Sequence, residues 1–78
     1  VTVKYFGMLT DKTGKSTETI NLDSSLTVDQ LNQYLIQKYT PLANCIYQIA
    51  IDNILIADKS IVINNSIEVS LLPPFSGG

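Results

Sequence analysis

Alternating apolar and polar residues open the chain. Val1, Val3 and Tyr5 are separated by polar positions, which is the period of two expected of a strand with one buried face. Residues 16–22 are rich in threonine and isoleucine and predict a second strand. Residues 7–15 between them hold two glycines among short polar residues, a composition typical of a loop. We therefore expect an N-terminal β-hairpin.

The next segment has the spacing of an amphipathic helix. Thr27 followed three residues later by Gln30 is a capping box, in which each side chain satisfies a backbone N–H of the other residue. Pro41 disfavours helical geometry at the residue before it, so the helix should end near Tyr39. The apolar residues that share one helical face and should pack on the sheet are Val28, Leu31, Leu35 and Tyr39.

The second half of the chain predicts short strands joined by tight turns. Asp52-Asn53 suits the turn of a hairpin. Asn64-Asn65 is expected to supply left-handed backbone geometry before the last strand. In that last strand, Ile67, Val69 and Leu71 should take the core-facing positions. The strands are expected at residues 47–52, 54–57, 61–63 and 66–72.

The order of elements is a hairpin, a helix and then a set of strands. This order is typical of an α+β fold, in which one mixed sheet carries the helix across one face. Right-handed crossovers and short links favour a central position for the last strand, beside the first strand and parallel to it. That is the ubiquitin-like β-grasp arrangement, and we expect residues 1–72 to form it.

Residues 73–78 are expected to form an extended C-terminal tail. Pro73 and Pro74 cannot donate backbone hydrogen bonds, so pairing of the last strand should stop there. Gly77 and Gly78 lack side chains and could thread a channel too narrow for other residues, which would deliver the Gly78 carboxylate to its end. A disordered terminus would account for the glycines alone. Two rigid prolines and an aromatic residue placed before them favour a functional tail.

Two apolar residues fall on the polar phase of their strands. Phe6 follows Tyr5 at the end of the first strand, and Leu72 follows Leu71 at the end of the last. If these strands are adjacent, both side chains meet on the helix-free face of the sheet, at the base of the tail. An aromatic and an aliphatic side chain exposed at this place predict a partner-docking patch. The alternative is a second, minor core beneath loops.

Composition narrows the possible chemistry. The 78 residues carry a formal net charge of -2, five scattered lysines and no arginine, which disfavours nucleic-acid binding. Because the chain has no histidine and only one cysteine, we expect no catalytic triad, no disulfide and no metal site. We interpret that cysteine, Cys45, as a small apolar residue at a strand start. With no apolar run of ~18 residues and no signal-peptide pattern at the start, we expect a cytoplasmic protein.

Three segments carry a resemblance to a known family. They are Val3-Lys4-Tyr5-Phe6-Gly7, Leu26-Thr27-Val28-Asp29-Gln30-Leu31 and, most specifically, residues 68–78 with the sequence EVSLLPPFSGG. Along nearly its whole length the chain resembles the small subunit of molybdopterin synthase, a ubiquitin-like sulfur carrier. Thiamin-pathway sulfur carriers and ubiquitin-like modifiers share the diglycine end but typically lack the two prolines.

The resemblance implies a non-catalytic, sulfur-donating subunit of a transferase complex. An ATP-dependent, E1-like enzyme would adenylate the carboxylate of Gly78, and a sulfur donor would then convert it to a thiocarboxylate. The large subunit of molybdopterin synthase, in a heterotetramer, would accept the tail in its active site. There the sulfur would attack cyclic pyranopterin monophosphate in molybdenum cofactor biosynthesis. The chain itself would bind no cofactor, and ATP would be used by the activating enzyme.

The same resemblance assigns partner contacts to individual residues. The apolar docking residues would be Phe6, Leu55 and Leu72, although the nearby turn leaves the face of Leu55 unreadable from the sequence. Phe75 would anchor the tail in the partner's channel, with packing on its own domain as the alternative. The tail residues that would enter the partner ahead of Gly78 are Pro73, Pro74, Phe75, Ser76 and Gly77. The sequence departs from the family pattern at Thr10, Asp52, Ser66 and Ile67.

Other functions remain open on the residues alone. A ubiquitin-like protein modifier would share the adenylation step and then form an isopeptide bond between Gly78 and a lysine of its target. A sulfur carrier of another, thiamin-type pathway would use the same carboxylate. A plain binding module would not need Gly77 and Gly78 at all.

Overall fold

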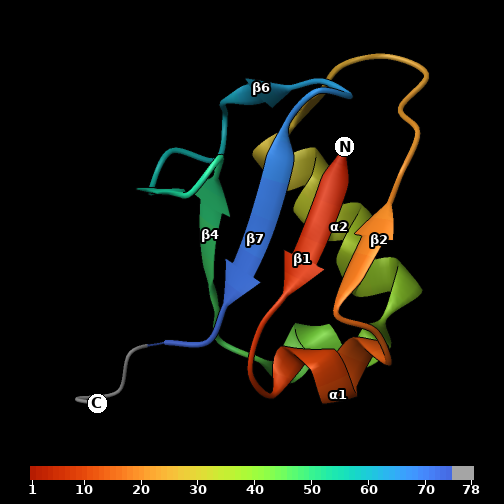
Figure 1. Cartoon of the computed structure of the whole chain (residues 1–78), viewed down its shortest axis with the longest axis vertical. Coiled ribbons are helices and arrows are strands. Elements are labelled where there is room, and N and C mark those ends of the chain that lie inside the picture. The colour runs from red at the N-terminus through yellow and green to blue at the C-terminus, as the bar shows by residue number, and fades with distance from the viewer. Residues whose placement is uncertain (75–78) are drawn as a thin grey trace.

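The computed structural model describes residues 1–74, and Figure 1 shows their arrangement. The predicted tail residues Phe75, Ser76, Gly77 and Gly78 lie outside the described residues. The elements are, in chain order, β1 (Thr2–Tyr5), α1 (Leu9–Thr13), β2 (Thr17–Thr19), β3 (Leu26–Thr27), α2 (Val28–Lys38), the 3-10 helix η1 (Thr40–Asn44), β4 (Gln48–Ile51), β5 (Ile54–Ile56), β6 (Val62–Ile63) and β7 (Glu68–Leu72).

Five strands form one mixed sheet in the order β2-β1-β7-β4-β5. The last strand, β7, is central: it runs parallel to β1 on one side and antiparallel to β4 on the other. β2 pairs antiparallel with β1, and β5 pairs antiparallel with β4. Helix α2 crosses one face of this sheet (Figure 1). The expected α+β, β-grasp architecture with a parallel first and last strand is confirmed.

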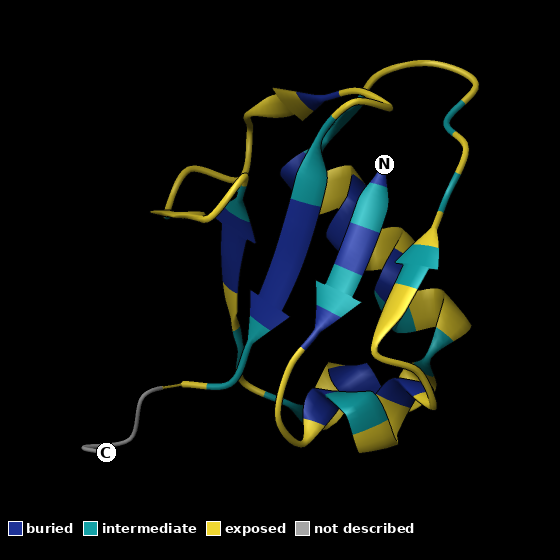
Figure 2. Cartoon of the chain, in the orientation of Figure 1, coloured by how far each residue is buried: buried dark blue, intermediate teal, exposed yellow. Residues whose placement is uncertain are grey.

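The hydrophobic core lies between α2 and the sheet. Val28, Leu31 and Leu35 of the helix are buried together with Val3 and Val69 of the central strands. Figure 2 shows the buried positions running along β4, β7 and the inner side of α2. The apolar face of the helix therefore packs on every second residue of the strands, as the helical period of 3.6 and the strand period of two predict. The other buried apolar residues of this cluster are Val1, Tyr5, Leu9, Leu42, Ile49, Ile63 and Leu71.

Helix α2 begins with the expected capping box. The hydroxyl of Thr27 accepts a hydrogen bond from the Gln30 N–H at 3.1 Å, and the Gln30 side chain accepts one from the Thr27 N–H at 2.9 Å. The helix ends at Lys38, one residue before Tyr39. Tyr39, expected on the buried stripe, is only partly buried. The local sequence therefore fixes both ends of this helix.

A second, two-stranded sheet covers the start of α2. β3 pairs antiparallel with β6, outside the main sheet. The carbonyl of Ile61 accepts a hydrogen bond from the Val28 N–H at 2.9 Å. The carbonyl of Lys59 accepts one from the Asp29 N–H, also at 2.9 Å. The expectation of a single sheet was wrong for residues 61–63, which pair with β3 instead, and the segment 59–61 satisfies first-turn N–H groups of the helix.

Residues 7–15 contain a short helix where we expected only a loop. Helix α1 buries Leu9 and Thr13 and exposes Asp11 and Lys12. The Thr13 hydroxyl donates to the carbonyl of Leu9 at 3.0 Å. The helix stops at Gly14, which has φ +80° and donates its N–H to the carbonyl of Thr10. Five helical residues are too few to show a 3.6-residue period, so the prediction failed here.

The two predicted turns form for different reasons. Asp52 and Asn53 have φ values of 47° and 70°, the left-handed pair that a tight hairpin turn needs, as expected. Asn64 and Asn65 have no positive φ, so the expected left-handed geometry there was wrong. Instead, the Asn64 side chain accepts a hydrogen bond from the Ser66 N–H at 2.9 Å. A side-chain hydrogen bond of this kind reverses the chain without left-handed backbone.

A largely buried carboxylate joins β2 to β1 and α2. Glu18 accepts hydrogen bonds from the hydroxyls of Tyr5 and Tyr39 at 2.5 and 2.7 Å, and from Lys38 Nζ at 2.9 Å. Burial alone would raise the pKa of Glu18, but these three hydrogen bonds outweigh it and lower that pKa. Burial, together with the bond to Glu18, raises the pKa of Tyr5, so its hydroxyl remains a donor.

Two further features bear on function. Across residues 1–74, no helix is long and apolar enough to cross a membrane, and no group of three or more His, Cys, Asp or Glu side chains is placed to hold a metal ion. Cys45 is partly exposed between η1 and β4, and its thiol donates to the carbonyl of Pro41 at 3.4 Å. It therefore precedes the strand that we expected it to begin.

Candidate functional site

The sheet face opposite α2 is open to solvent, and none of the helices drawn for residues 1–74 covers it (Figure 1). Directly opposed residues of neighbouring strands point to the same face. Leu55 of β5 is opposite Ala50 of β4, and Ala50 is opposite Ser70 of β7. Ser70 is in turn opposite Lys4 of β1. These four residues alternate with core residues and therefore lie on the helix-free face.

Phe6 and Leu72 extend this face at the end where β7 leads into the tail. Each lies two positions beyond a member of that row, so each points to the same side. Tyr5 and Leu71 are register partners, and the Phe6 N–H donates to the Leu71 carbonyl at 3.2 Å. Phe6 is 42% exposed, and Leu72 is half-buried. The structure thus brings together the pair that strand alternation predicted.

Leu55 lies on the same face but not beside that pair. It is 52% exposed in β5, and β4 separates it from β7. Ala50 and Ser70, which lie between, are only 3% and 5% exposed. Because their side chains are small, the surface of the sheet lies lower there than at Leu55 and Leu72. The sequence left the face of Leu55 open and did not indicate that Ser70, on the polar phase of its strand, would be buried.

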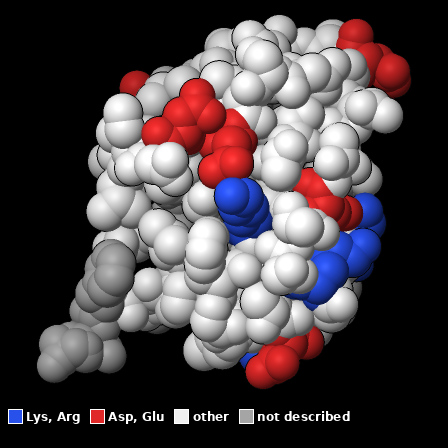
Figure 3. All heavy atoms as spheres, viewed as in Figure 1, with Lys and Arg blue, Asp and Glu red and all other residues white. Residues whose placement is uncertain are grey.

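One ion pair joins neighbouring strands on this face. Lys4 Nζ lies 3.3 Å from a carboxylate oxygen of Glu68 in the neighbouring strand. Figure 3 shows a small group of charged side chains in the middle of the face and a broad area without them toward the C-terminal end of β7. Phe6 and Leu72 therefore border an uncharged surface, which suits contact with an apolar partner. We call Phe6, Leu55 and Leu72 the docking patch.

The chain leaves the sheet at the proline pair, as predicted. β7 ends at Leu72, after which Pro73 is half-buried and Pro74 is exposed. Pro73 lies against Gly7, which follows β1 and has φ +59°. Sequence reasoning missed this contact, because a glycine directly after a strand is a weak signal on its own. Of the predicted tail, only Pro73 and Pro74 are described.

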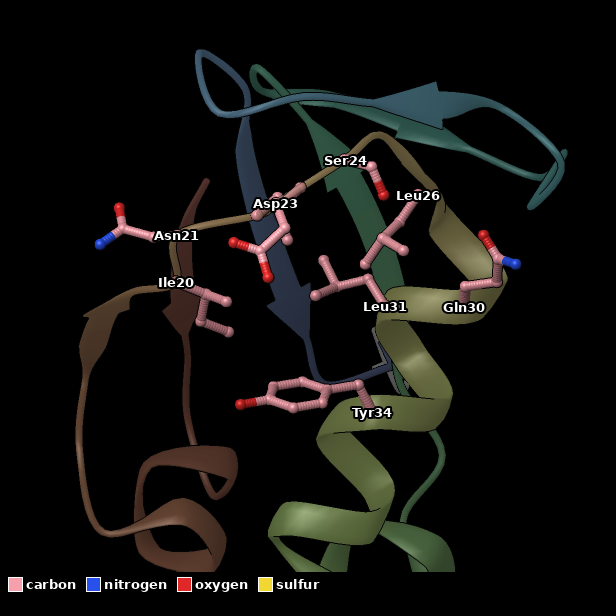
Figure 4. Close-up of a pocket in the computed structure, with 9 residues that line it drawn as sticks. Ile20, Asn21, Asp23, Ser24, Leu26, Gln30, Leu31 and Tyr34 are labelled. Carbon is pink, nitrogen blue, oxygen red and sulfur yellow. The ribbon is translucent and has the colours of Figure 1, made fainter.

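A surface pocket of about 370 Å³ lies away from this exit, between α2 and the segment that follows β2. Figure 4 shows Leu26 and Leu31 on its walls, the ring of Tyr34 at one end and the carboxylate of Asp23 nearby. Strand β1 stands between β2 and β7, so the pocket is not continuous with the tail exit. It contains no residue that the sequence predicted as functional. The candidate site is therefore the docking patch with the tail exit.

The fold and this site define a class of protein. A β-grasp sheet whose central last strand ends at Leu72 and leads, in sequence, through two prolines to a diglycine is the arrangement that the sequence predicted for a ubiquitin-like carrier. A model of the ThiS family matches residues 3–78. The chain belongs to the ThiS family, and it is a ubiquitin-like sulfur-carrier protein.

Solved structures share its fold. The putative molybdopterin converting factor subunit 1 from Pyrococcus furiosus superimposes with a TM-score of 0.85 at 18% identity over 94% of each chain. Small archaeal modifier protein 1 from Haloferax volcanii gives 0.79 at 18% identity, again over 94% of each chain. A chain of the complex of subunits 1 and 2 of the molybdopterin-converting factor from Helicobacter pylori gives 0.70 at 23% identity, over 99% of this chain and 96% of that one.

Proposed function

We propose that this chain is the sulfur-carrying small subunit of a molybdopterin synthase. Its Gly78 carboxylate would be adenylated, converted to a thiocarboxylate and used to donate sulfur to cyclic pyranopterin monophosphate. The observation that carries the proposal is the exit of the chain at Pro73, directly beside the exposed, uncharged end of the docking patch. A partner that binds this patch would receive the tail in the same encounter.

The chemistry needs an activating step. A free carboxylate is ionised at neutral pH and is a poor electrophile. An E1-like enzyme would join it to AMP from ATP and release pyrophosphate, which makes the carbonyl carbon of Gly78 attackable. Attack by sulfur at the sulfide oxidation level then displaces AMP and leaves the thiocarboxylate, with no change of oxidation state. We place this ATP-dependent step in the cytoplasm. The chain needs no cofactor of its own for it, because the reactive atoms belong to Gly78 and the activating enzyme.

The docking patch supplies the partner contact. Phe6, Leu55 and Leu72 present apolar surface around a floor of small residues, and exposed aromatic and aliphatic side chains are common anchors in protein interfaces. The partner would be the large catalytic subunit, arranged with this chain in a heterotetramer. The solved complex of subunits 1 and 2 from Helicobacter pylori, which contains a chain of this fold, supports that choice.

A reconstituted reaction tests the proposal. The thiocarboxylated chain, mixed with the large subunit and cyclic pyranopterin monophosphate, should yield molybdopterin and return to the carboxylate form. A variant with one alanine added after Gly78 is the matched control, because it keeps the fold and loses the terminal glycine carboxylate. Product from the extended variant, or none from the thiocarboxylated wild type, would contradict the proposal.

A second candidate is a ubiquitin-like protein modifier, favoured by the similarity to small archaeal modifier protein 1. The modifier would pass its activated Gly78 to a lysine amine instead of a sulfur donor. Denaturing gels from cells that express a tagged chain separate the two functions. Covalent ladders that disappear when Gly78 is deleted favour the modifier, and a single band favours the carrier. A thiamin-type sulfur carrier would be thiocarboxylated but would give no molybdopterin.

A further inference from the structure

Pro73 packs on a glycine that has no room for a side chain. A Cβ atom at Gly7 would lie 2.7 Å from Cγ of Pro73, with Cδ and Cβ of the same ring at 3.6 and 3.8 Å. Carbon atoms in ordinary van der Waals contact stay about 3.5 to 4.0 Å apart. The first residue after β7 therefore lies where only a glycine at position 7 can accept it.

Neither partner of this contact can easily move away. The Gly7 carbonyl accepts hydrogen bonds from the N–H and the hydroxyl of Thr10, at 3.1 and 2.9 Å. The residue before it is fixed as well, because the Phe6 N–H donates to β7 at 3.2 Å. On the other side, the pyrrolidine ring of Pro73 is closed on its own backbone nitrogen, so a change of ring pucker is the only movement of Cγ that leaves the backbone in place. An added methyl group at Gly7 would therefore displace the chain at Pro73.

The chain contains a second left-handed glycine, at which the effect of backbone strain can be measured without the contact. Gly14 also has a left-handed backbone, with φ +80°, but a Cβ there would have no atom within 4 Å. Replacement of either glycine by alanine forces a residue with a side chain into left-handed geometry. Only the replacement at Gly7 also pushes on Pro73. A difference in activity between the two variants therefore measures the effect of the contact between position 7 and Pro73.

We propose that Gly7, held in place by Thr10, is a positioning residue that sets the direction in which the tail leaves the sheet. The inference rests on the proposed function, because direction matters only if Gly78 must reach a partner's active site. A six-residue segment that a partner holds extended spans at most about 20 Å, so a rotation of about 10° at its first residue would move the far end by about 3 Å. A displacement of that size is enough to lower the rate of a reaction strongly.

The first test compares Gly7→Ala with Gly14→Ala in the activation step. Both variants are first shown to be folded by their amide NMR spectra, and ATP–pyrophosphate exchange is then measured with the activating enzyme. Because the docking patch is intact, Gly7→Ala should keep KM for the chain within about twofold and lose kcat by about tenfold or more. Gly14→Ala should keep both within about twofold. A kcat for Gly7→Ala equal to that of Gly14→Ala overturns the inference.

Two more variants examine the mechanism of positioning. In Gly7→Ala/Pro73→Ala the ring atoms that would clash are absent, so the effect of Gly7→Ala should fall from about tenfold to less than about threefold in that background. Thr10→Val removes the hydroxyl that holds the Gly7 carbonyl, and it should lower kcat, whereas Thr10→Ser should not. Additive effects of Gly7→Ala and Pro73→Ala would contradict a direct contact.

A structural measurement decides the inference even if the proposed function fails. Wild-type protein should show NOEs between the Gly7 Hα and the Pro73 ring protons, and Gly7→Ala should change the dipolar couplings of Pro73 and Pro74 while Gly14→Ala leaves them unchanged. If wild-type chain is never activated but these results hold, the sulfur-carrier function is wrong and the positioning contact stands. Absence of the NOEs, or unchanged couplings in Gly7→Ala, removes the contact itself.

Discussion

At the residue scale, the carboxylate of Glu18 is the acceptor of several hydrogen bonds that join different elements of the fold. One carboxylate, with its side chain 9% exposed, accepts hydrogen bonds from three residues on β1 and at the C-terminal end of α2. Lys15 adds a more distant ion pair at 3.8 Å. An edge strand as short as β2 has few other means of attachment, so we expect Glu18 to matter more for stability than a surface carboxylate.

Glu18→Gln should lower the free energy of unfolding by about 2 kcal/mol, the usual cost of losing hydrogen bonds to a charged group. The measurement is urea denaturation at pH 7, followed by circular dichroism. Glu68→Gln is the control, because the Lys4–Glu68 pair is partly exposed and pairs of that kind contribute about 0 to 1 kcal/mol. Equal losses in the two variants would contradict the special role of Glu18.

The stabilisation by Glu18 should also depend on pH. Its hydrogen bonds lower the folded-state pKa below the unfolded value, so the unfolded chain binds the proton more readily. The contribution is therefore fully present above the ordinary glutamate pKa of about 4.3 and is lost as the pH falls through the lower, folded-state value. We expect urea denaturation of wild type and Glu18→Gln from pH 7 to pH 2 to show that their difference in free energy of unfolding becomes smaller below about pH 4. A difference that is independent of pH, or that grows in acid, contradicts this.

At the element scale, the elements that could be predicted are those whose own sequence contains a start or stop signal. The capping box of Thr27 and Gln30 predicted the first residue of α2 correctly, and Pro73 predicted the last residue of β7. Helix α1 was missed because its five residues depend on burying Leu9 against the rest of the core, a contact distant in sequence. The pairing of β3 with β6 was missed for the same reason, since each strand has two residues.

Thr27→Ala should lower the free energy of unfolding by about 1 kcal/mol, because it removes the oxygen that accepts the Gln30 N–H. Thr27→Ser keeps that oxygen and should cost only a small fraction of this amount. Urea denaturation of the three proteins under one set of conditions measures both effects. If serine is as destabilising as alanine, the loss comes from packing of the Thr27 methyl group and the cap contributes nothing.

At the scale of the whole molecule, alternation in the strands was enough to place Phe6 and Leu72 on one face, beside each other. It could not place Leu55, because the left-handed Asp52-Asn53 turn that sets the phase of β5 must be known first. Nor could it indicate the contact of Gly7 with Pro73, which joins two residues far apart in the sequence. The docking patch was thus predictable in part, and the control of the tail's direction was not.

Phe6→Ala and Leu55→Ala should each weaken binding of the large subunit by about tenfold, which corresponds to about 1.4 kcal/mol. Phe6 is 42% and Leu55 52% exposed, and neither belongs to the buried core, so the thermal midpoint of the isolated chain should change little. Val62→Ala is the control, because Val62 is 62% exposed on β6, away from the tail exit. Isothermal titration calorimetry measures the affinities. An effect of Val62→Ala as large as the others would place the interface elsewhere.

The intact mass of the chain tests most directly whether Gly78 carries sulfur. The purified protein is incubated with the activating enzyme, ATP and a sulfur donor, beside a variant that lacks Gly78. The wild type should gain the mass that corresponds to the exchange of one oxygen for one sulfur atom, and there should be no gain in the variant or without ATP. An unchanged wild-type mass, under conditions that convert a known carrier, would contradict the assignment of sulfur to Gly78.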